Sequence, residues 1–295
     1  RQGRYKDSNQ EVFKSNTIIS TQGNHDSKDL DGHINAPGLG DGKYDSIVYS
    51  SNIGNVKFIV LNNAPYPKEV SELENNEEFQ KAIEFLRAEA ADAKANGMWT
   101  ILGFHKPLYT GASHMKDNDM RVYRKILNPI INEIGVDMVL TGHDHVYTRM
   151  FIDKNGNNAT EKLDEINGNP VLTGKEDAPF HLVGGHGGGL KWYRTTDYPT
   201  LEGDPLLPNY EFADKNSAQE EPPSADLKEQ TYTVFEIDGD TAHITAYTSK
   251  YNDDESLQKA PQVYDEFYIR RKTPELNVKF EIAEDSKDFA RFIDN

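Results

Sequence analysis

The feature that most constrains the fold is an alternation of short apolar runs with longer amphipathic segments between residues 56 and 140. The runs Val56–Leu61, Met98–Phe104 and Val136–Leu140 each contain at most one charged residue, as expected of strands that are buried on both faces. Between them, apolar residues recur at steps of three and four, which is the helical period. Buried strands that alternate with helices indicate an α/β core, in which helices pack against a sheet.

Two helices are expected in this core. Ser71 and Glu74 fit a capping box, so the first helix should begin at Ser71 and continue until Gly97. The second should cover residues 118–135, where Pro129 is able to kink it. Each helix would bury one face and leave its charged face in solvent.

Strand and turn signals occupy much of the remaining chain. Thr17–Ser20 is a short strand signal, and a hairpin is expected around residues 52–55. After Arg149 the sequence changes to β and turn material, with a strand at Phe180–Val183 and a hairpin centred on Asp238-Gly239. We therefore expect a disordered or remnant segment at 1–16, one domain over 17–272, and a tail or linker to a further module at 273–295.

Composition excludes several classes of function. The net charge is −17, from 49 acidic and 32 basic residues, so the chain lacks the positive surface that a general nucleic-acid or anionic-membrane binder needs. It contains no cysteine, which excludes disulfides and thiolate metal sites. No window approaches the roughly 18 apolar residues of a membrane-spanning helix. Any transition-metal ligand must therefore come from His, Asp, Glu, Asn or Tyr.

Polar side chains follow three of the expected strands. Asn24-His25-Asp26 comes after the first, His105 after the run at 98–104, and His143-Asp144-His145 after the run at 136–140. Because ligands of α/β sheets bind at the carboxyl ends of strands, these groups can converge although they are far apart in sequence. Imidazole and amide groups could then bind one metal ion or two neighbouring ions. Hydrogen-bonded loop histidines are the structural alternative.

The order G-N-H-D at 23–26, a strand-end His105 and G-H-D-H at 142–145 resembles the calcineurin-like metallophosphoesterases. The run G-H-D-H-V-Y-T-R at 142–149 and the nearby His114 are similar to the purple acid phosphatase branch in particular. The resemblance implies a four-layer αββα sandwich and hydrolysis of phosphate esters, with phosphomonoesters as substrates. A phosphodiesterase or nucleotidase is the alternative within the class. A small phosphorylated molecule is the implied substrate.

The resemblance also implies a dinuclear centre of Mn, Zn or Fe ions. Asn24, His105 and His143 would bind one ion, and His145 would bind the other. The D-x-H and G-D-x-x blocks that precede G-N-H-D in the family are absent before Gly23. We therefore expect an N-terminally truncated sandwich that lacks half of the site, with partial or no metal bound and little activity by itself. A catalytically inactive binding or structural module is the corresponding alternative.

Further roles are implied for residues around this centre. His25, oriented by Asp26, would protonate the leaving group, and His114 would contact the substrate. Arg149 and His186 are candidate substrate-binding residues. Each has an alternative, since His114 could be an ordinary loop histidine, His186 lies in a glycine-rich turn, and Arg149 could pair with a carboxylate. The family branch, the acidity and the absence of cysteine favour an extracellular or cell-surface location over a cytoplasmic one.

Overall fold

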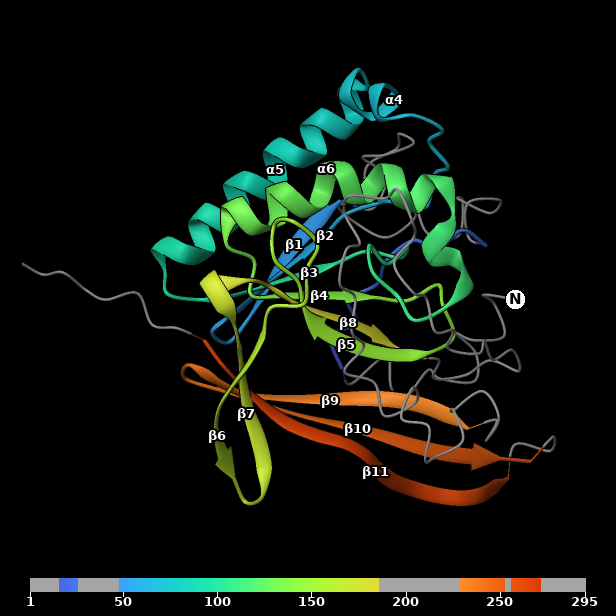
Figure 1. Ribbon diagram of the computed structural model, residues 1–295, viewed down its shortest axis with the longest axis vertical. Coiled ribbons are helices and arrows are strands. Elements are labelled where there is room, and N and C mark those ends of the chain that lie inside the picture. The colour runs from blue at the N-terminus through green and yellow to red at the C-terminus, as the bar shows by residue number, and fades with distance from the viewer. Residues whose placement is uncertain (1–15, 26–47, 186–228, 253–255, 272–295) are drawn as a thin grey trace, which may run out of the picture.

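A computed structural model describes residues 16–25, 48–185, 229–252 and 256–271, and shows two β-sheets packed face to face (Figure 1). Helices cover the outer face of the first sheet: α4 (Val70–Glu74), α5 (Glu77–Ala95) and α6 (Asn118–Ile134). The first sheet has the order β1 (Tyr49–Ile53), β2 (Val56–Val60), β3 (Trp99–Gly103), β4 (Met138–Thr141), β8 (Phe180–Gly184), β5 (Tyr147–Phe151). The second has the order β6 (Thr160–Ile166), β7 (Asn169–Gly174), β11 (Leu257–Arg270), β10 (Thr241–Tyr251), β9 (Gln230–Asp238).

Strand direction in the first sheet fixes where a site can form. β2, β3, β4 and β8 run parallel to one another, whereas β1 and β5 are antiparallel edge strands. The carboxyl ends of the four parallel strands therefore meet at one edge, which we call the carboxyl edge. As the sequence predicts, the loops that carry His105 and His143 leave the sheet there.

Two apolar layers hold the sandwich together. One lies between the helices and the first sheet and includes Leu86, Leu102 and Tyr123. The other lies between the two sheets and includes Trp99 and Phe267. Complete burial of a large apolar side chain contributes roughly 1.5–3 kcal/mol, so each layer supplies much of the driving force for folding.

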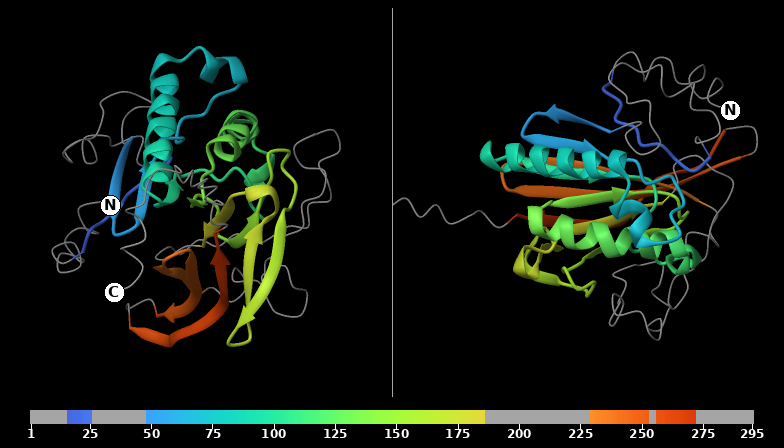
Figure 2. Two further views of the ribbon diagram at one scale, coloured as in Figure 1. Left: turned by 90° about the vertical axis from the view of Figure 1, so that its left-hand side faces the viewer. Right: turned by 90° about the horizontal axis from the view of Figure 1, so that it is seen from above.

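The α/β class, with two packed sheets, is confirmed. Within the described residues, helices cover only the first sheet, so three of the four expected layers are seen (Figure 2). The second sheet presents its other face without a helix from this part of the chain. No helix among the described residues is long and apolar enough to cross a membrane.

Several predicted elements are confirmed. β1 and β2 form the expected hairpin, in which Ile53 pairs with Val56 around a turn that places Gly54 at φ +59°. β9 and β10 form the second hairpin. α6 ends at Gly135, whose φ of +71° is the left-handed cap typical of glycine.

Two predictions are wrong. Thr17–Ser20 forms no strand, because it finds no backbone ladder and its contact with β1 runs through the hydroxyl of Tyr49 to the backbone of Ser20. The first long helix does not begin at Ser71. It is split in two because the side chain of Asn76 caps α5, accepting a hydrogen bond from the N–H of Phe79 at 2.8 Å.

Candidate metal centre

Three of the predicted ligands meet at the carboxyl edge. Nε2 of His105 lies 2.8 Å from Oδ1 of Asn24 and 3.1 Å from Nδ1 of His143. The rings of His105 and His143 meet edge to face, with centroids 5.0 Å apart. The residues come from three separate segments, so their convergence is a property of the fold and not of any one loop.

These spacings fit a metal ion. Two ligand atoms bound at about 2.1 Å from one ion stand about 3.0 Å apart at a right angle and about 3.4 Å apart in a tetrahedron. The contacts of His105 with Asn24 and His143, at 2.8 and 3.1 Å, are close to the first value. An amide oxygen and two imidazole nitrogens are also suitable donors for Zn, Mn or Fe.

Backbone hydrogen bonds extend the pairing of β3 and β4 beyond the sheet. The N–H of Gly142 donates to the carbonyl of His105 at 3.0 Å, and the N–H of Phe104 donates to the carbonyl of Leu140 at 3.3 Å. The loops that carry His105 and His143 are therefore held side by side. Their ligand atoms are positioned by the sheet itself.

The loop after β2 ties the other ligand segments to this edge. The buried amide of Asn63 accepts from the N–H of Lys106 at 2.9 Å and donates to its carbonyl at 2.7 Å. Its neighbour Asn62 donates to Oε1 of Gln22 at 2.8 Å, two residues before Asn24. The two asparagines thus connect the segment of Asn24 with that of His105.

His143 has an unusual backbone conformation. Its φ is +65°, and the N–H of Asp144 donates to the carbonyl of Gly142 at 2.7 Å across it. A positive φ in a non-glycine residue costs about 1–3 kcal/mol and persists only where the surroundings impose it. Such strain is concentrated at functional sites, and here it falls on a candidate ligand.

Burial keeps the central imidazoles neutral. It lowers the pKa of His105 to about 3, and the charges of His143, Lys106, His25 and His145 act in the same direction. Burial is also the main cause that lowers the pKa of His143 to about 4. Because a metal-binding imidazole must be deprotonated, both side chains are ready to coordinate an ion at neutral pH.

The other predicted residues are placed less completely. His25 is exposed and His145 is half-buried, and both lie near enough to His105 to influence its protonation. Asp26 and His186 lie outside the described residues. The structure therefore gathers Asn24, His25, His105, His143 and His145 in one region, while the partner proposed for His25 is not described.

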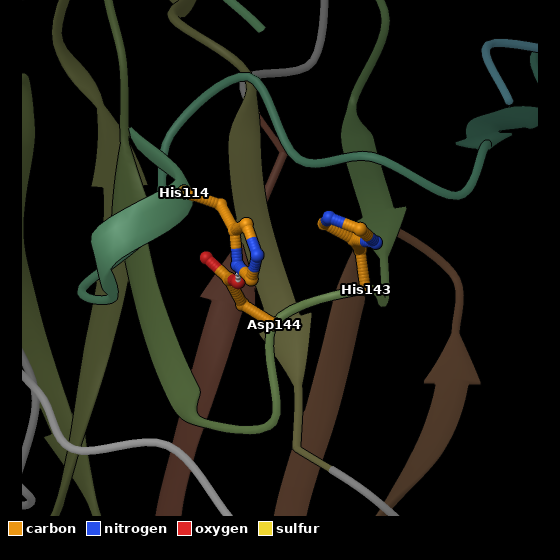
Figure 3. Close-up of side chains that lie close together, drawn as sticks. All are labelled: His114, His143 and Asp144. Atoms are coloured by element: carbon orange, nitrogen blue, oxygen red, sulfur yellow. Dashed lines mark hydrogen bonds and ion pairs between the residues drawn. The ribbon is translucent and has the colours of Figure 1, made fainter. Parts of the chain in front are cut away.

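His114 belongs to the same region. It stands on the short 3₁₀ helix η1 (Ser113–Lys116), with its ring centroid 4.6 Å from that of His143 (Figure 3). Its Nδ1 contacts Oδ1 of Asp144. Sequence reasoning missed this role of Asp144, although the signal was present, since Asp144 is the residue between the two histidines of G-H-D-H.

Arg149, a candidate substrate-binding residue, instead pairs with a carboxylate. Its Nη2 donates to Oδ1 of Asp265 at 3.2 Å, and its guanidinium lies over the ring of Phe267, 4.0 Å from the centroid. Phe267 belongs to the apolar layer between the sheets. The structure therefore agrees with the alternative in which Arg149 pairs with a carboxylate.

An α/β sandwich in which candidate histidine and asparagine ligands gather at the carboxyl edge of a parallel sheet has the arrangement expected of a metal-dependent hydrolase. A sequence profile of the calcineurin-like phosphoesterases matches residues 3–147, which supports the resemblance to this family that the motifs indicate. No curated protein sequence matches the chain.

Three solved structures resemble the chain at low identity. They are a purple acid phosphatase from yellow lupin (Lupinus luteus) seeds (19% identity, TM-score 0.48), PhoD (12%, 0.45), and GAP50, the anchor in the inner membrane complex of Plasmodium (11%, 0.32). The matches cover 76%, 80% and 76% of this chain, respectively. They cover only 33%, 44% and 54% of those proteins, so this chain spans a third to about half of their length.

Proposed function

We propose that the protein hydrolyses phosphate esters, and phosphomonoesters in particular, at a metal centre on the carboxyl edge. The observation that supports this proposal is the meeting of Asn24, His105 and His143 at 2.8 and 3.1 Å in a chain that a phosphoesterase profile matches over residues 3–147. These residues would hold one ion, and His145 would contribute to a second. Bound cations would supply neutralisation of the phosphate oxygens and activation of a water molecule.

The protein's own residues would divide the remaining work. His25, exposed beside Asn24, would donate a proton to the leaving alkoxide, a contribution of about 10²–10⁴-fold in related reactions. His114 would contact the phosphate from η1. The backbone bonds between the β3 and β4 loops would keep the ligands in place, so that little reorganisation accompanies the reaction.

Hydrolysis of aryl phosphates tests the proposal. We expect the intact protein, as distinct from the 295-residue chain alone, to release phosphate from an aryl monophosphate faster than it cleaves a bis-aryl phosphate when it is supplied with Mn²⁺, Zn²⁺ or iron. A faster reaction with the diester would replace the assignment to monoesters by one to diesters. Absence of turnover of both substrates with all three metals would contradict the proposed function.

Metal content tests the number of ions. The ligands that converge on His105 are neutral, and cation sites gain affinity from carboxylates that neutralise the charge. For the 295-residue chain alone we therefore expect less than one equivalent of bound metal and little activity. Elemental analysis that finds two tightly bound ions per chain would contradict this expectation.

Location of the protein outside the cell stays a prediction.

A further inference from the structure

Asp144 is the most buried acidic side chain in the described part of the chain, with no exposed surface. Its Oδ1 contacts Nδ1 of His114, while its buried Oδ2 has no hydrogen-bond partner among the described residues. Burial of a carboxylate is costly unless a hydrogen-bonding or charged group compensates for it. His114 is therefore the group that makes this buried carboxylate tolerable.

The side chains of His114, His143 and Asp144 are of the types that bind metals, and their ligand atoms lie within 4.8 Å of one another. The contact between His114 and Asp144 nevertheless speaks against an ion between them. Nδ1 of His114 and Oδ1 of Asp144 contact each other directly, and this leaves no room for an ion between the two atoms. Asp144 thus acts on His114 directly.

The turn at His143 separates the two side chains that follow Gly142. Figure 3 shows His143 and Asp144 leaving the loop in different directions, with Asp144 reaching the ring of His114. The second nitrogen of that ring is turned to the side on which His143 lies. One strained turn therefore supplies both a candidate ligand and a carboxylate that engages the neighbouring histidine.

We propose that Asp144 is a positioning residue for His114, whose Nδ1–H it accepts so that Nε2 faces the phosphate ester at the metal centre. This inference rests on the proposed function. A carboxylate that accepts from one ring nitrogen fixes both the tautomer and the orientation of an imidazole, which is how the other nitrogen is aimed at a reacting group. The sequence suggested such a pairing for His25 and Asp26.

A double-mutant cycle in the intact, metal-loaded protein tests the coupling. Asp144→Ala is expected to lower kcat about tenfold to a hundredfold with a smaller change in KM, because the ring loses its orientation. In a His114→Ala background the same substitution should have no further effect. Asp144→Asn should restore most of kcat, since the amide oxygen accepts the same N–H. An equal loss with and without His114 would overturn the proposal.

Asp265→Asn provides a matched control. Asp265 is also a buried carboxylate, but it pairs with Arg149 between the sheets. Its substitution is expected to lower stability and to combine additively with His114→Ala in kcat. If Asp265 coupled to His114 as strongly as Asp144 does, the cycle would measure only a loss of stability. That result would overturn the positioning role of Asp144.

Nitrogen NMR of the His114 ring is independent of turnover. We expect the proton on Nδ1 in the wild-type protein and in Asp144→Asn, and a mixture of tautomers in Asp144→Ala. A wild-type proton on Nε2 would overturn the proposal. If the tautomer is as expected but no phosphate ester is cleaved, the proposed function fails. In that case the positioning role is tested by adding inorganic phosphate to the metal-loaded protein. A shift of the Nε2 signal on addition of phosphate supports the positioning role, and an unchanged signal overturns it.

Discussion

The buried carboxylates Asp265 and Asp144 show how differently the layer between the sheets and the carboxyl edge are built. Both oxygens of Asp265 are engaged, one by Nη2 of Arg149 at 3.2 Å and the other by the hydroxyl of Tyr147 at 3.0 Å. Asp144 uses one oxygen on His114 and leaves the other without a partner among the described residues. A buried carboxylate oxygen without a hydrogen bond is unusual in a folded protein. The position of Asp144 beside the candidate metal centre offers an explanation.

The backbone shows the same contrast. Tyr147, Arg149 and Asp265 lie in strands β5 and β11, and none of the three has a positive φ. His143 is held at a positive φ in a turn just beyond a strand. The pair of Arg149 and Asp265 is thus carried by two strands, whereas the candidate ligand His143 lies in a strained turn.

The largest effect is expected at the carboxyl edge. His143→Ala removes a candidate ligand and the ring beside His114, so hydrolysis should fall by about 10³-fold or more and metal binding by at least about a hundredfold. Activity assays and elemental analysis measure the two losses. His243→Ala is the matched control, because His243 stacks on Tyr268 in the second sheet at 4.4 Å. Equal losses in both variants would remove the distinction between the two regions.

Substitutions in the layer between the sheets should lower the stability of the protein and leave its catalysis unchanged. Arg149→Met leaves Asp265 buried without its cation, which should lower the free energy of unfolding by about 3–5 kcal/mol. Urea denaturation measures this loss, and KM for an aryl phosphate should stay unchanged. A second substitution, Asp265→Leu, should recover part of the stability by removing the unpaired charge. A large rise in KM in Arg149→Met would indicate that Arg149 binds the substrate.

A buried histidine away from the edge should make stability depend on pH. His181 in β8 is buried, its Nε2 has no partner among the described residues, and burial lowers its pKa to about 3. The unfolded chain, with a pKa near 6.5, binds more protons, so this contribution to stability is present above pH 6.5 and is lost as the pH falls towards 3.

His181→Phe should remove this dependence. Relative to the wild type, the variant is expected to gain on the order of 2 kcal/mol at pH 5 compared with pH 7.5. Urea denaturation at the two pH values measures the difference, in which any packing cost of the larger ring cancels. An identical difference from the wild type at both values would show that protonation of His181 does not limit acid stability.

The sequence predicts the first sheet better than the second, for a physical reason. β2, β3 and β4 are apolar because both of their faces are covered, and this pattern is local. β11 runs from Leu257 to Arg270 with Lys259 and Pro261 near its start and several exposed residues. Its pairing depends on β10 and β7, so no local pattern indicates it.

The site divides in the same way. Glycine-led motifs just after strands predict that His105 and His143 approach each other, because parallel strands bring their ends to one edge. The contact of Asp144 with His114 joins positions that are 30 residues apart, and Asn63 reaches Lys106 over 43. Such contacts follow from the path of the loops, which spacing along the chain does not determine.

The smallest effect is expected from a substitution that touches neither region. Asn76 caps α5 on the helical face of the sandwich, and Asn76→Ala should lower the free energy of unfolding by about 1 kcal/mol. Metal binding and the coupling between Asp144 and His114 should both be retained, because the cap lies outside the carboxyl edge and the layer between the sheets. Urea denaturation and the kinetic cycle measure the two quantities. If Asn76→Ala also weakened the coupling between Asp144 and His114, that coupling would depend on the stability of the whole fold. The contrast between Asp144 and Asp265 would then disappear.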